Sequence, residues 1–196
     1  MKLLLKIIFL FSSFILNASA SPWKNGDVLL QSRRCYMCRL IESETAAPYS
    51  HMGLIVWSKG WKVIDALGKV RLINLDDFLR EGDPAKVHLH LRPKLKRSLA
   101  WHDVEAFLGA GYDADFLWDN LGADGREIYY CSELITKILN PLLWDPLLPS
   151  PMDFSKHWND WLRIFNGDPP QGKLGNSPAD FYRSSEFILV GEVNAI

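Results

Sequence analysis

A β-hairpin in the N-terminal third of the chain is the feature that most constrains its fold. Residues 51–57 (HMGLIVW) and 61–66 (WKVIDA) are rich in β-branched and aromatic residues, and the tripeptide 58–60 (SKG) between them is typical of a turn. Trp57 and Trp61 can flank a three-residue loop with the glycine at its left-handed position. The hairpin therefore predicts an antiparallel sheet.

Other segments alternate between strand and helix patterns. Short apolar runs predict further strands at residues 27–31, 70–73, 87–91 and 187–190. Helical periodicity, with Gly or Pro at several ends, predicts helices at residues 33–45, 98–108, 130–139 and 153–165. The last of these would carry on one face Phe154, Trp158, Trp161, Leu162 and Phe165. Helices mixed with an antiparallel sheet indicate an α+β fold.

The first 20 residues are typical of a secretory signal peptide. Lys2 and Lys6 precede an apolar run over residues 7–11, and the segment 18–20 (ASA) supplies the small residues of a cleavage site. Polar residues interrupt the apolar stretch, which disfavours a membrane anchor, and no cysteine follows Ala20, which disfavours a lipid anchor. We predict one mature domain, residues 21–196, that is periplasmic or secreted. Contact with a membrane surface stays open, but a span is not expected.

Composition and net charge limit the classes of partner that we expect for this chain. The formal net charge is -1 and no basic run is present, so a nucleic-acid partner is not expected. Hydrophobic residues make up 48% of the chain, enough for an ordinary core. The oligomeric state is left open.

Three cysteines stand in a chain that is expected to be exported. Cys35 and Cys38 are either two partly buried helix residues or a local disulfide, and a redox role for so short a motif is a weaker interpretation. A zinc site needs about four ligands, and no second Cys/His pair has suitable spacing, so no metal is predicted. Cys131 is left over, which indicates a free reactive thiol or an intermolecular bridge.

Cys131 lies where polar and small residues give way to a helical pattern, so we expect its thiol at or near a helix N-terminus. Backbone N–H groups and the helix dipole there favour a negatively charged sulfur. The same N–H groups can receive the oxyanion of a tetrahedral intermediate. A thiolate nucleophile also needs a base, which is usually histidine.

His51 is the best candidate for that base among five histidines. It opens a strand and precedes Gly53, whereas His102 and His157 lie on predicted helices. His88 and His90 alternate with apolar residues in a strand, and we expect them to share an exposed face.

Asp65 is the candidate for the group that orients the imidazole. A three-residue loop in the hairpin puts Asp65 opposite Gly53 and on the same face as His51, within diagonal cross-strand reach. A two-residue loop would place Asp65 on the other face.

The chain resembles the YiiX/YebB-like group of permuted papain-like cysteine hydrolases in the NlpC/P60 superfamily. The resemblance spans nearly all of the mature chain, with His before Cys. The matching segments are 26–31 (GDVLLQ), 49–53 (YSHMG), 63–68 (VIDALG), 111–118 (GYDADFLW), 130–134 (YCSEL) and 177–181 (SPADF).

This resemblance implies a circularly permuted papain-like fold, with an antiparallel sheet or small barrel packed on helices. It implies Cys131 as nucleophile, His51 as base and Asp65 at the third position, where close relatives commonly have Glu. Tyr49 resembles the aromatic residue before the catalytic His and is expected to help form the oxyanion or substrate site. No metal or organic cofactor is implied.

The activity that the resemblance implies is hydrolysis of an amide, such as cell-wall peptide, through an acyl-enzyme on Cys131, so the expected substrate is a small molecule, a peptide or a lipid acyl group. Two alternatives stand beside it. One is an esterase or acyltransferase acting on lipid or lipoprotein acyl groups. The other is a non-catalytic binding module with a vestigial site. The apolar segment 141–151 is either a lid that touches acyl chains or a packed crossing of the core, and the exposure of Leu143, Trp144 and Leu147 separates the two.

Overall fold

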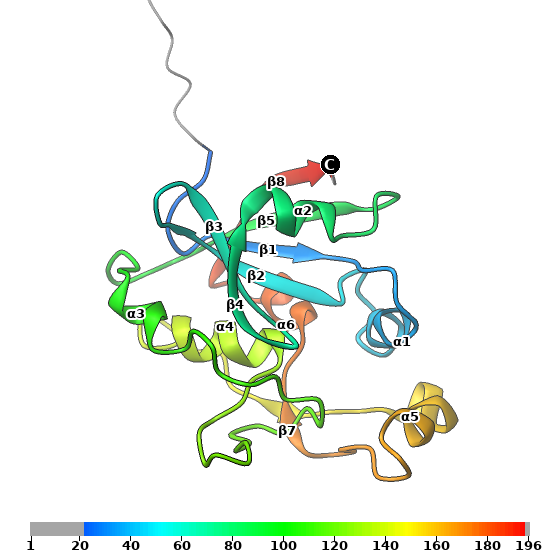
Figure 1. The fold of residues 1–196 in the computed structure, drawn as a ribbon. Helices are drawn as coiled ribbons and strands as arrows, with labels where there is room; N and C mark the ends of the chain where they lie inside the picture. The colour runs from blue at the N-terminus through cyan, green and yellow to red at the C-terminus, as the bar shows by residue number, and fades with distance from the viewer. Residues whose placement is uncertain (1–21, 195–196) are drawn as a thin grey trace, which may run out of the picture.

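The structure, a computed structural model, describes residues 22–194 (Figure 1). The predicted signal peptide, residues 1–20, lies outside the described residues. Six strands form one antiparallel sheet in the order β4-β3-β2-β1-β5-β8, which confirms the predicted α+β class. These strands are β1 (Val28–Gln31), β2 (His51–Trp57), β3 (Trp61–Leu67), β4 (Lys69–Asn74), β5 (Val87–Pro93) and β8 (Phe187–Asn194).

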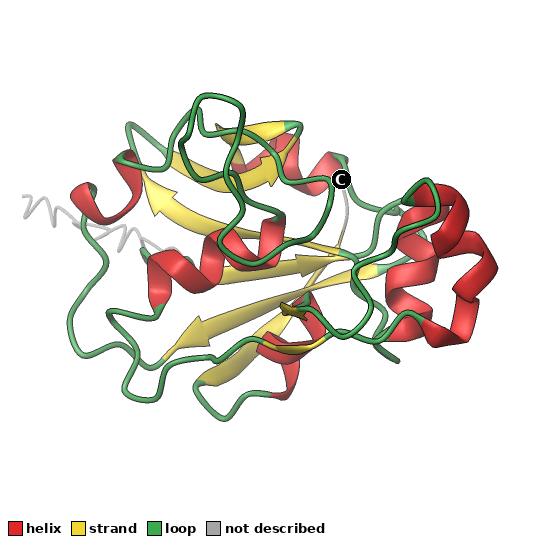
Figure 2. Ribbon diagram, turned by 90° about the horizontal axis from the view of Figure 1, so that it is seen from below, coloured by secondary structure: helices red, strands yellow, loops and turns green. Residues whose placement is uncertain are grey.

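Helices cover both faces of this sheet. On one face, Leu134, Ile135 and Ile138 of α4 (Cys131–Leu139) pack against strand residues that point toward this helix, among them Leu30 and Leu54. On the other face α2 (Leu75–Arg80) covers a smaller cluster. Figure 2, seen from below, shows the strands running behind helices and loops. No helix within residues 22–194 is long and apolar enough to cross a bilayer.

The remaining elements extend the fold beyond the sheet. They are α1 (Tyr36–Glu44), α3 (His102–Glu105), β6 (Ser150–Pro151), the 3-10 helix η1 (Ser155–His157), α5 (Trp158–Ile164), β7 (Leu174–Gly175) and α6 (Pro178–Arg183). β6 and β7 pair with each other. Both α1 and α5 lie past the same end of the sheet (Figures 1 and 2).

The hairpin has the predicted register. Trp57 pairs with Trp61, so the loop has three residues, and Lys59 and Gly60 both take positive φ. This register places Asp65 on the same face of the sheet as His51.

The prediction that His88 and His90 are exposed is wrong. Both are buried, because other parts of the chain cover their face of the sheet: α2 and Gly82 lie against His88, and the Trp23 ring lies 4.5 Å from the His90 ring. His90 Nε2 lies 2.6 Å from Asp27 Oδ2, and His88 Nε2 lies 3.3 Å from the Leu79 carbonyl oxygen. Burial lowers the pKa of His88.

Two predicted helices are shorter than expected. The segment 98–108 keeps only α3, because the chain after it leaves the helix to bond β4, with Val70 N donating to Ala110 O and Gly109 N to Val70 O. The segment 153–165 is split into η1 and α5, and Trp158 is exposed rather than on the buried face.

Gly53 tests how tightly β2 packs. A Cβ at this position would lie 2.3 Å from Val63 Cγ1 and 2.9 Å from Phe78 Cε2. Overpacking of this kind costs about 1–3 kcal/mol, so Gly53→Ala is expected to lower the melting temperature by roughly 3–10 °C. Gly191→Ala is the matched control, since a Cβ there meets nothing within 4 Å and the change is expected to stay within about 0.5 kcal/mol. Equal melting temperatures for the two variants would contradict this packing argument.

Candidate active site

Cys131 begins α4, directly after Tyr130 in extended backbone. Among the described residues it carries the free thiol, and it is 9% exposed. The first N–H groups of a helix have no intrahelical acceptor and carry the positive end of the helix dipole. The thiol therefore lies where backbone N–H groups can stabilise negative charge, as its position before the helical pattern predicted.

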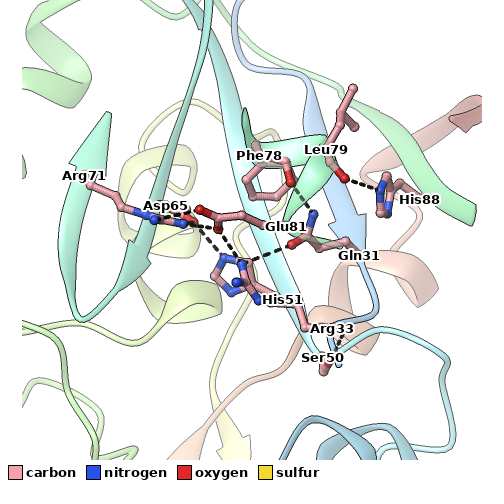
Figure 3. Close-up of polar contacts among 10 residues, drawn as sticks. All are labelled: Gln31, Arg33, Ser50, His51, Asp65, Arg71, Phe78, Leu79, Glu81 and His88. Atoms are coloured by element: carbon pink, nitrogen blue, oxygen red, sulfur yellow. Dashed lines mark hydrogen bonds and ion pairs between the residues drawn. The ribbon is translucent and has the colours of Figure 1, made fainter. Parts of the chain in front are cut away.

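His51 begins β2 and is held from behind by Asp65. His51 Nε2 lies 2.8 Å from Asp65 Oδ2, both side chains are buried, and the imidazole stacks on the Phe78 ring at 5.8 Å (Figure 3). The Cys131 thiol lies close enough to the His51 ring to contribute to raising the pKa of that imidazole. Because Nε2 is hydrogen-bonded to Asp65, Nδ1 is the ring nitrogen that can exchange a proton with the Cys131 sulfur.

The surroundings of His51 favour its charged form. Burial alone lowers its pKa, but the hydrogen bonds to Asp65 and Cys131 outweigh burial and raise the pKa to about 9. The imidazole is therefore cationic near neutral pH. Burial raises the pKa of Asp65, yet the bonds from His51 and Arg71 hold it below its ordinary value.

Arg71 and Glu81 complete a network that sequence reasoning missed. Arg71 donates to Asp65 Oδ1 through Nε at 2.8 Å and to Asp65 Oδ2 through Nη2 at 3.0 Å. Its guanidinium also pairs with Glu81, which in turn accepts from Arg33 at 2.8 Å (Figure 3). Asp65 and Arg71 are directly opposite each other in the β3–β4 pair. The turn at Gly68, which has positive φ, sets this register, so Gly68 was the sequence signal from which the position of Arg71 could have been predicted.

Tyr49 does not line the cavity described below. Its buried ring contacts Tyr182 at 5.8 Å, and burial raises its pKa to about 12. Tyr112 lines the cavity instead, and burial together with the nearby Cys131 raises its pKa. The role expected for Tyr49 at the oxyanion or substrate site stays a prediction.

A cavity of about 920 Å³ opens at these residues. Cys131 and His51 both line it, as does the disulfide that joins Cys35 and Cys38. That bond resolves the two alternatives left open for this pair. The volume lies in the upper range of small-molecule sites.

The apolar segment 141–151 is not a lid over this cavity. Leu143 is fully buried in the main core, and Leu147 packs against that core. Trp144 is 68% exposed, but it does not line the cavity, and Ser150 is the residue of this segment that does. The segment packs in the core at Leu142 and Leu143 and then runs along the surface, where Trp144 and Leu148 are exposed.

A second His–Asp–Arg group lies away from the cavity. Asp27 accepts from Arg92 at 2.8 Å through both carboxylate oxygens, and His90 Nε2 is bonded to the same carboxylate. Burial raises the pKa of Asp27, but the bonds from Arg92 and His90 lower it below its ordinary value. This group repeats the chemistry around Asp65 without a thiol in contact, so it supplies matched controls.

Residues 23–189 match the family described as "Permuted papain-like amidase enzyme, YaeF/YiiX, C92 family". The chain belongs to this family. The match covers β1 to β5, α4 and the residues that line the cavity, so the resemblance noted in the sequence is confirmed at the level of family and fold.

Two relatives agree with this assignment. The Escherichia coli (strain K12) protein named "Uncharacterized protein YiiX" is 29% identical over 137 residues, 66% of this chain and 64% of that protein. The match thus spans just under two thirds of that relative's length. The crystal structure of YiiX from Escherichia coli O157:H7, titled a metalloprotein, matches with a TM-score of 0.72 at 22% identity, over 87% of this chain and 97% of that chain. At this identity the likeness shows a shared fold.

Proposed function

We propose that this amidase-family chain is a cysteine amidase with Cys131 as nucleophile, His51 as general base and acid, and Asp65 as the group that orients His51. One observation carries the proposal. His51 is bonded through Nε2 to Asp65 and also contacts the Cys131 thiol at the start of α4. A nucleophile, a base and an orienting carboxylate in this order activate acyl transfer.

In the proposed reaction the Cys131 sulfur attacks the amide carbonyl carbon and a C–S bond forms. N–H groups of the first turn of α4 stabilise the developing oxyanion. His51 gives its proton to the leaving nitrogen as the C–N bond breaks. Water then loses a proton to His51 and attacks the thioester, the C–S bond breaks, and the thiolate returns. One water is consumed, and a carboxylic acid and an amine are released.

The acyl-enzyme is the species that tests this proposal. A p-nitrophenyl acyl ester is expected to transfer one acyl group to the protein, located on Cys131 by peptide mass mapping. A His51→Gln variant is expected to acylate far more slowly, because the thiolate loses its cationic partner. Acylation at another residue, or at equal rates in both proteins, would contradict the assignment.

The pKa of His51 predicts the pH dependence. The ion pair needs the imidazolium, so kcat/KM is expected to fall on the alkaline side with a midpoint near pH 9. The same raised pKa contributes stability that is fully present below about pH 6.5 and is lost as pH rises through about 9. A pH–rate profile over pH 5–10.5 checks this. An alkaline limb near pH 6.5 would show an unperturbed histidine.

The bond and the substrate are further parts of the proposal. An ester would form the same acyl-enzyme, so one acyl group presented as an amide and as an ester separates an amidase from a lipid or lipoprotein acyl esterase. Cell-wall peptides belong in the same comparison. The remaining alternative, a binding module, predicts no turnover and a Cys131 thiol that alkylates as slowly as a free peptide thiol.

A metal does not fit the described side chains. Within residues 22–194 no three His, Cys, Asp or Glu side chains are grouped so as to hold an ion. The YiiX crystal structure is titled a metalloprotein, but around His51 the Nε2 atom and the Asp65 carboxylate are already bonded within the protein.

Export to an oxidising compartment is also proposed. The signal-peptide pattern of residues 1–20 and the Cys35–Cys38 disulfide support it, since disulfides persist outside the reducing cytosol. The mature N-terminus is then expected at Ser21, which the intact mass of the exported protein would report.

A further inference from the structure

We propose that the disulfide between Cys35 and Cys38 is redox-active and exchanges with a peptide dithiol, with Cys35 as the sulfur that the incoming thiol attacks. This activity is separate from the proposed amide hydrolysis, because it uses neither Cys131 nor His51. Three features of the pair carry it: its place at the start of a helix, the unequal exposure of the two cysteines, and its access to the cavity.

The disulfide lies at the start of a helix that closely follows a strand. β1 ends at Gln31, a short segment follows, and Cys35 is then the N-cap of α1 in extended backbone (Figure 1). Cys38 lies in the first turn of the same helix and is bonded to Cys35. Helix N-termini and Cys-X-X-Cys pairs are both surroundings in which a cysteine thiolate is stabilised. The fold therefore supplies the placement that a redox role requires.

The first turn of α1 stabilises negative charge on Cys35. In the disulfide, the backbone N–H of Cys38 donates to Cys35 Sγ at 2.9 Å. This N–H has no intrahelical acceptor and belongs to the positive end of the helix dipole, so its bond to sulfur strengthens when Cys35 becomes a thiolate. The other residues of this turn, Tyr36 and Met37, carry no charge near neutral pH. Release of Cys35 as a thiolate is therefore favoured.

The arginines that precede the pair are already balanced. Arg33 pairs with Glu81 at 2.8 Å, and Arg34 pairs with Asp83 at 3.0 Å. The stabilisation of a Cys35 thiolate thus comes from helix α1 rather than from an unpaired cation. A reduced form that is stabilised in this way makes the corresponding disulfide a stronger oxidant.

The two cysteines differ in access to a partner. Cys35 is exposed, whereas Cys38 is only 7% exposed. Both line the cavity of about 920 Å³, which is wide enough to admit a peptide side chain. Exposed disulfides are the labile or catalytic ones, whereas structural disulfides resist reduction. An incoming thiol therefore reaches Cys35 first, and Cys38 is the sulfur that leaves.

The exchange proceeds in two balanced steps. A peptide thiolate attacks Cys35 Sγ, a mixed disulfide forms, the Cys35–Cys38 bond breaks, and the Cys38 sulfur takes the electron pair and a proton. The second peptide thiolate then attacks the peptide sulfur of the mixed disulfide, and Cys35 leaves as a thiolate. The peptide dithiol is oxidised to a disulfide, and the protein pair is reduced to two thiols. A small disulfide such as oxidised glutathione restores the protein pair by the reverse exchange.

Reduction of the folded protein tests this inference without a change in the pair. The Cys131→Ala protein is used, because Cys35 and Cys38 are then its only cysteines. Its reduction by dithiothreitol is followed by alkylation and intact mass, in native buffer and in urea. We expect the folded protein to be reduced at least about tenfold faster than the unfolded one, since only the folded helix stabilises the leaving thiolates. A native rate equal to or below the unfolded rate would identify a structural disulfide and overturn the proposal.

Two single-cysteine variants identify the attacked sulfur. In the Cys131→Ala protein, Cys38→Ser leaves Cys35 as the one thiol and Cys35→Ser leaves Cys38. Serine is also a good N-cap residue, so α1 is expected to persist in the second variant. With oxidised glutathione, the protein that keeps Cys35 is expected to form its mixed disulfide at least about tenfold faster, as read by intact mass. Equal rates, or a faster reaction of Cys38, would contradict the assignment of Cys35.

Transfer to a peptide completes the test. A synthetic peptide with two cysteines is mixed with the oxidised Cys131→Ala protein, and formation of the peptide disulfide is followed by mass spectrometry. About one peptide per protein is expected to be oxidised without another oxidant, and many when oxidised glutathione is added, at least about tenfold faster than with glutathione alone. The protein with Cys35→Ser and Cys38→Ser together is the control. Peptide oxidation no faster than in that control would overturn the proposal, whether or not the unmodified protein hydrolyses amides.

Discussion

Replacing Cys131 with alanine is expected to abolish turnover of any amide that the unmodified protein cleaves. The variant removes the atom that forms the covalent bond, and loss of a nucleophile costs at least about 10³-fold and as much as about 10⁶-fold in kcat. Cys131 lies at the first turn of α4 with its side chain nearly buried, so the change leaves a small void and only a modest loss of stability. Initial rates at saturating substrate, with melting curves for both proteins, measure the two effects.

A Cys131→Ser variant sharpens this test. Serine is close to cysteine in size and keeps a hydroxyl next to His51, but it is a far weaker nucleophile at the same position, so it is also expected to be inactive. Retained activity in either folded variant would mean that the acyl-enzyme forms elsewhere. Inactivity with an unchanged melting temperature is the result that the proposed chemistry predicts.

Asp65→Asn is expected to damage both catalysis and stability. The amide cannot balance the imidazolium and presents the wrong hydrogen-bonding pattern to His51, which lowers kcat by about 10²–10⁴-fold in comparable triads. Asp65 is fully buried and accepts from both His51 and Arg71, so loss of its charge is expected to cost about 2–4 kcal/mol. For a chain of this size that lowers the melting temperature by roughly 5–15 °C.

Asp27→Asn is the matched control for Asp65. Asp27 is equally buried and accepts from a histidine and an arginine in the same way, but its histidine, His90, does not contact the thiol. We expect a similar loss of stability and kcat within about twofold of the unmodified protein below the melting transition. A large loss of kcat in Asp27→Asn would mean that the Asp65 effect reports general destabilisation rather than its bond to His51.

The proximity of His51 and Asp65 could be predicted because the number of residues in a hairpin loop determines which residues of the two strands lie opposite each other. Trp57 and Trp61 flank a three-residue loop, and alternation along both strands then puts the imidazole and the carboxylate on one face. The helix at Cys131 was visible for a similar reason, since its boundary is marked by a local change of pattern. The roles of these residues remain proposals that the variants above test.

Other features depend on contacts that local sequence does not carry. His88 and His90 follow the alternation of a half-exposed strand, but α2 and Trp23 cover the face of the sheet that carries them. The helix expected at 153–165 is interrupted because its start bonds to distant groups, with Phe154 N donating to Gln171 Oε1 and His157 N to Glu44. Tertiary bonds outweigh local propensity at these positions.

Alkylation of Cys131 by iodoacetamide tests the central claim, the ion pair between Cys131 and His51, most directly. The rate is measured near neutral pH by intact mass for the unmodified protein, for His51→Gln and for the matched control His90→Gln. The account predicts fast labelling of Cys131 in the unmodified protein and in folded His90→Gln, and labelling at least about tenfold slower in His51→Gln. Equal rates in all three proteins, close to that of a free peptide thiol, would contradict it.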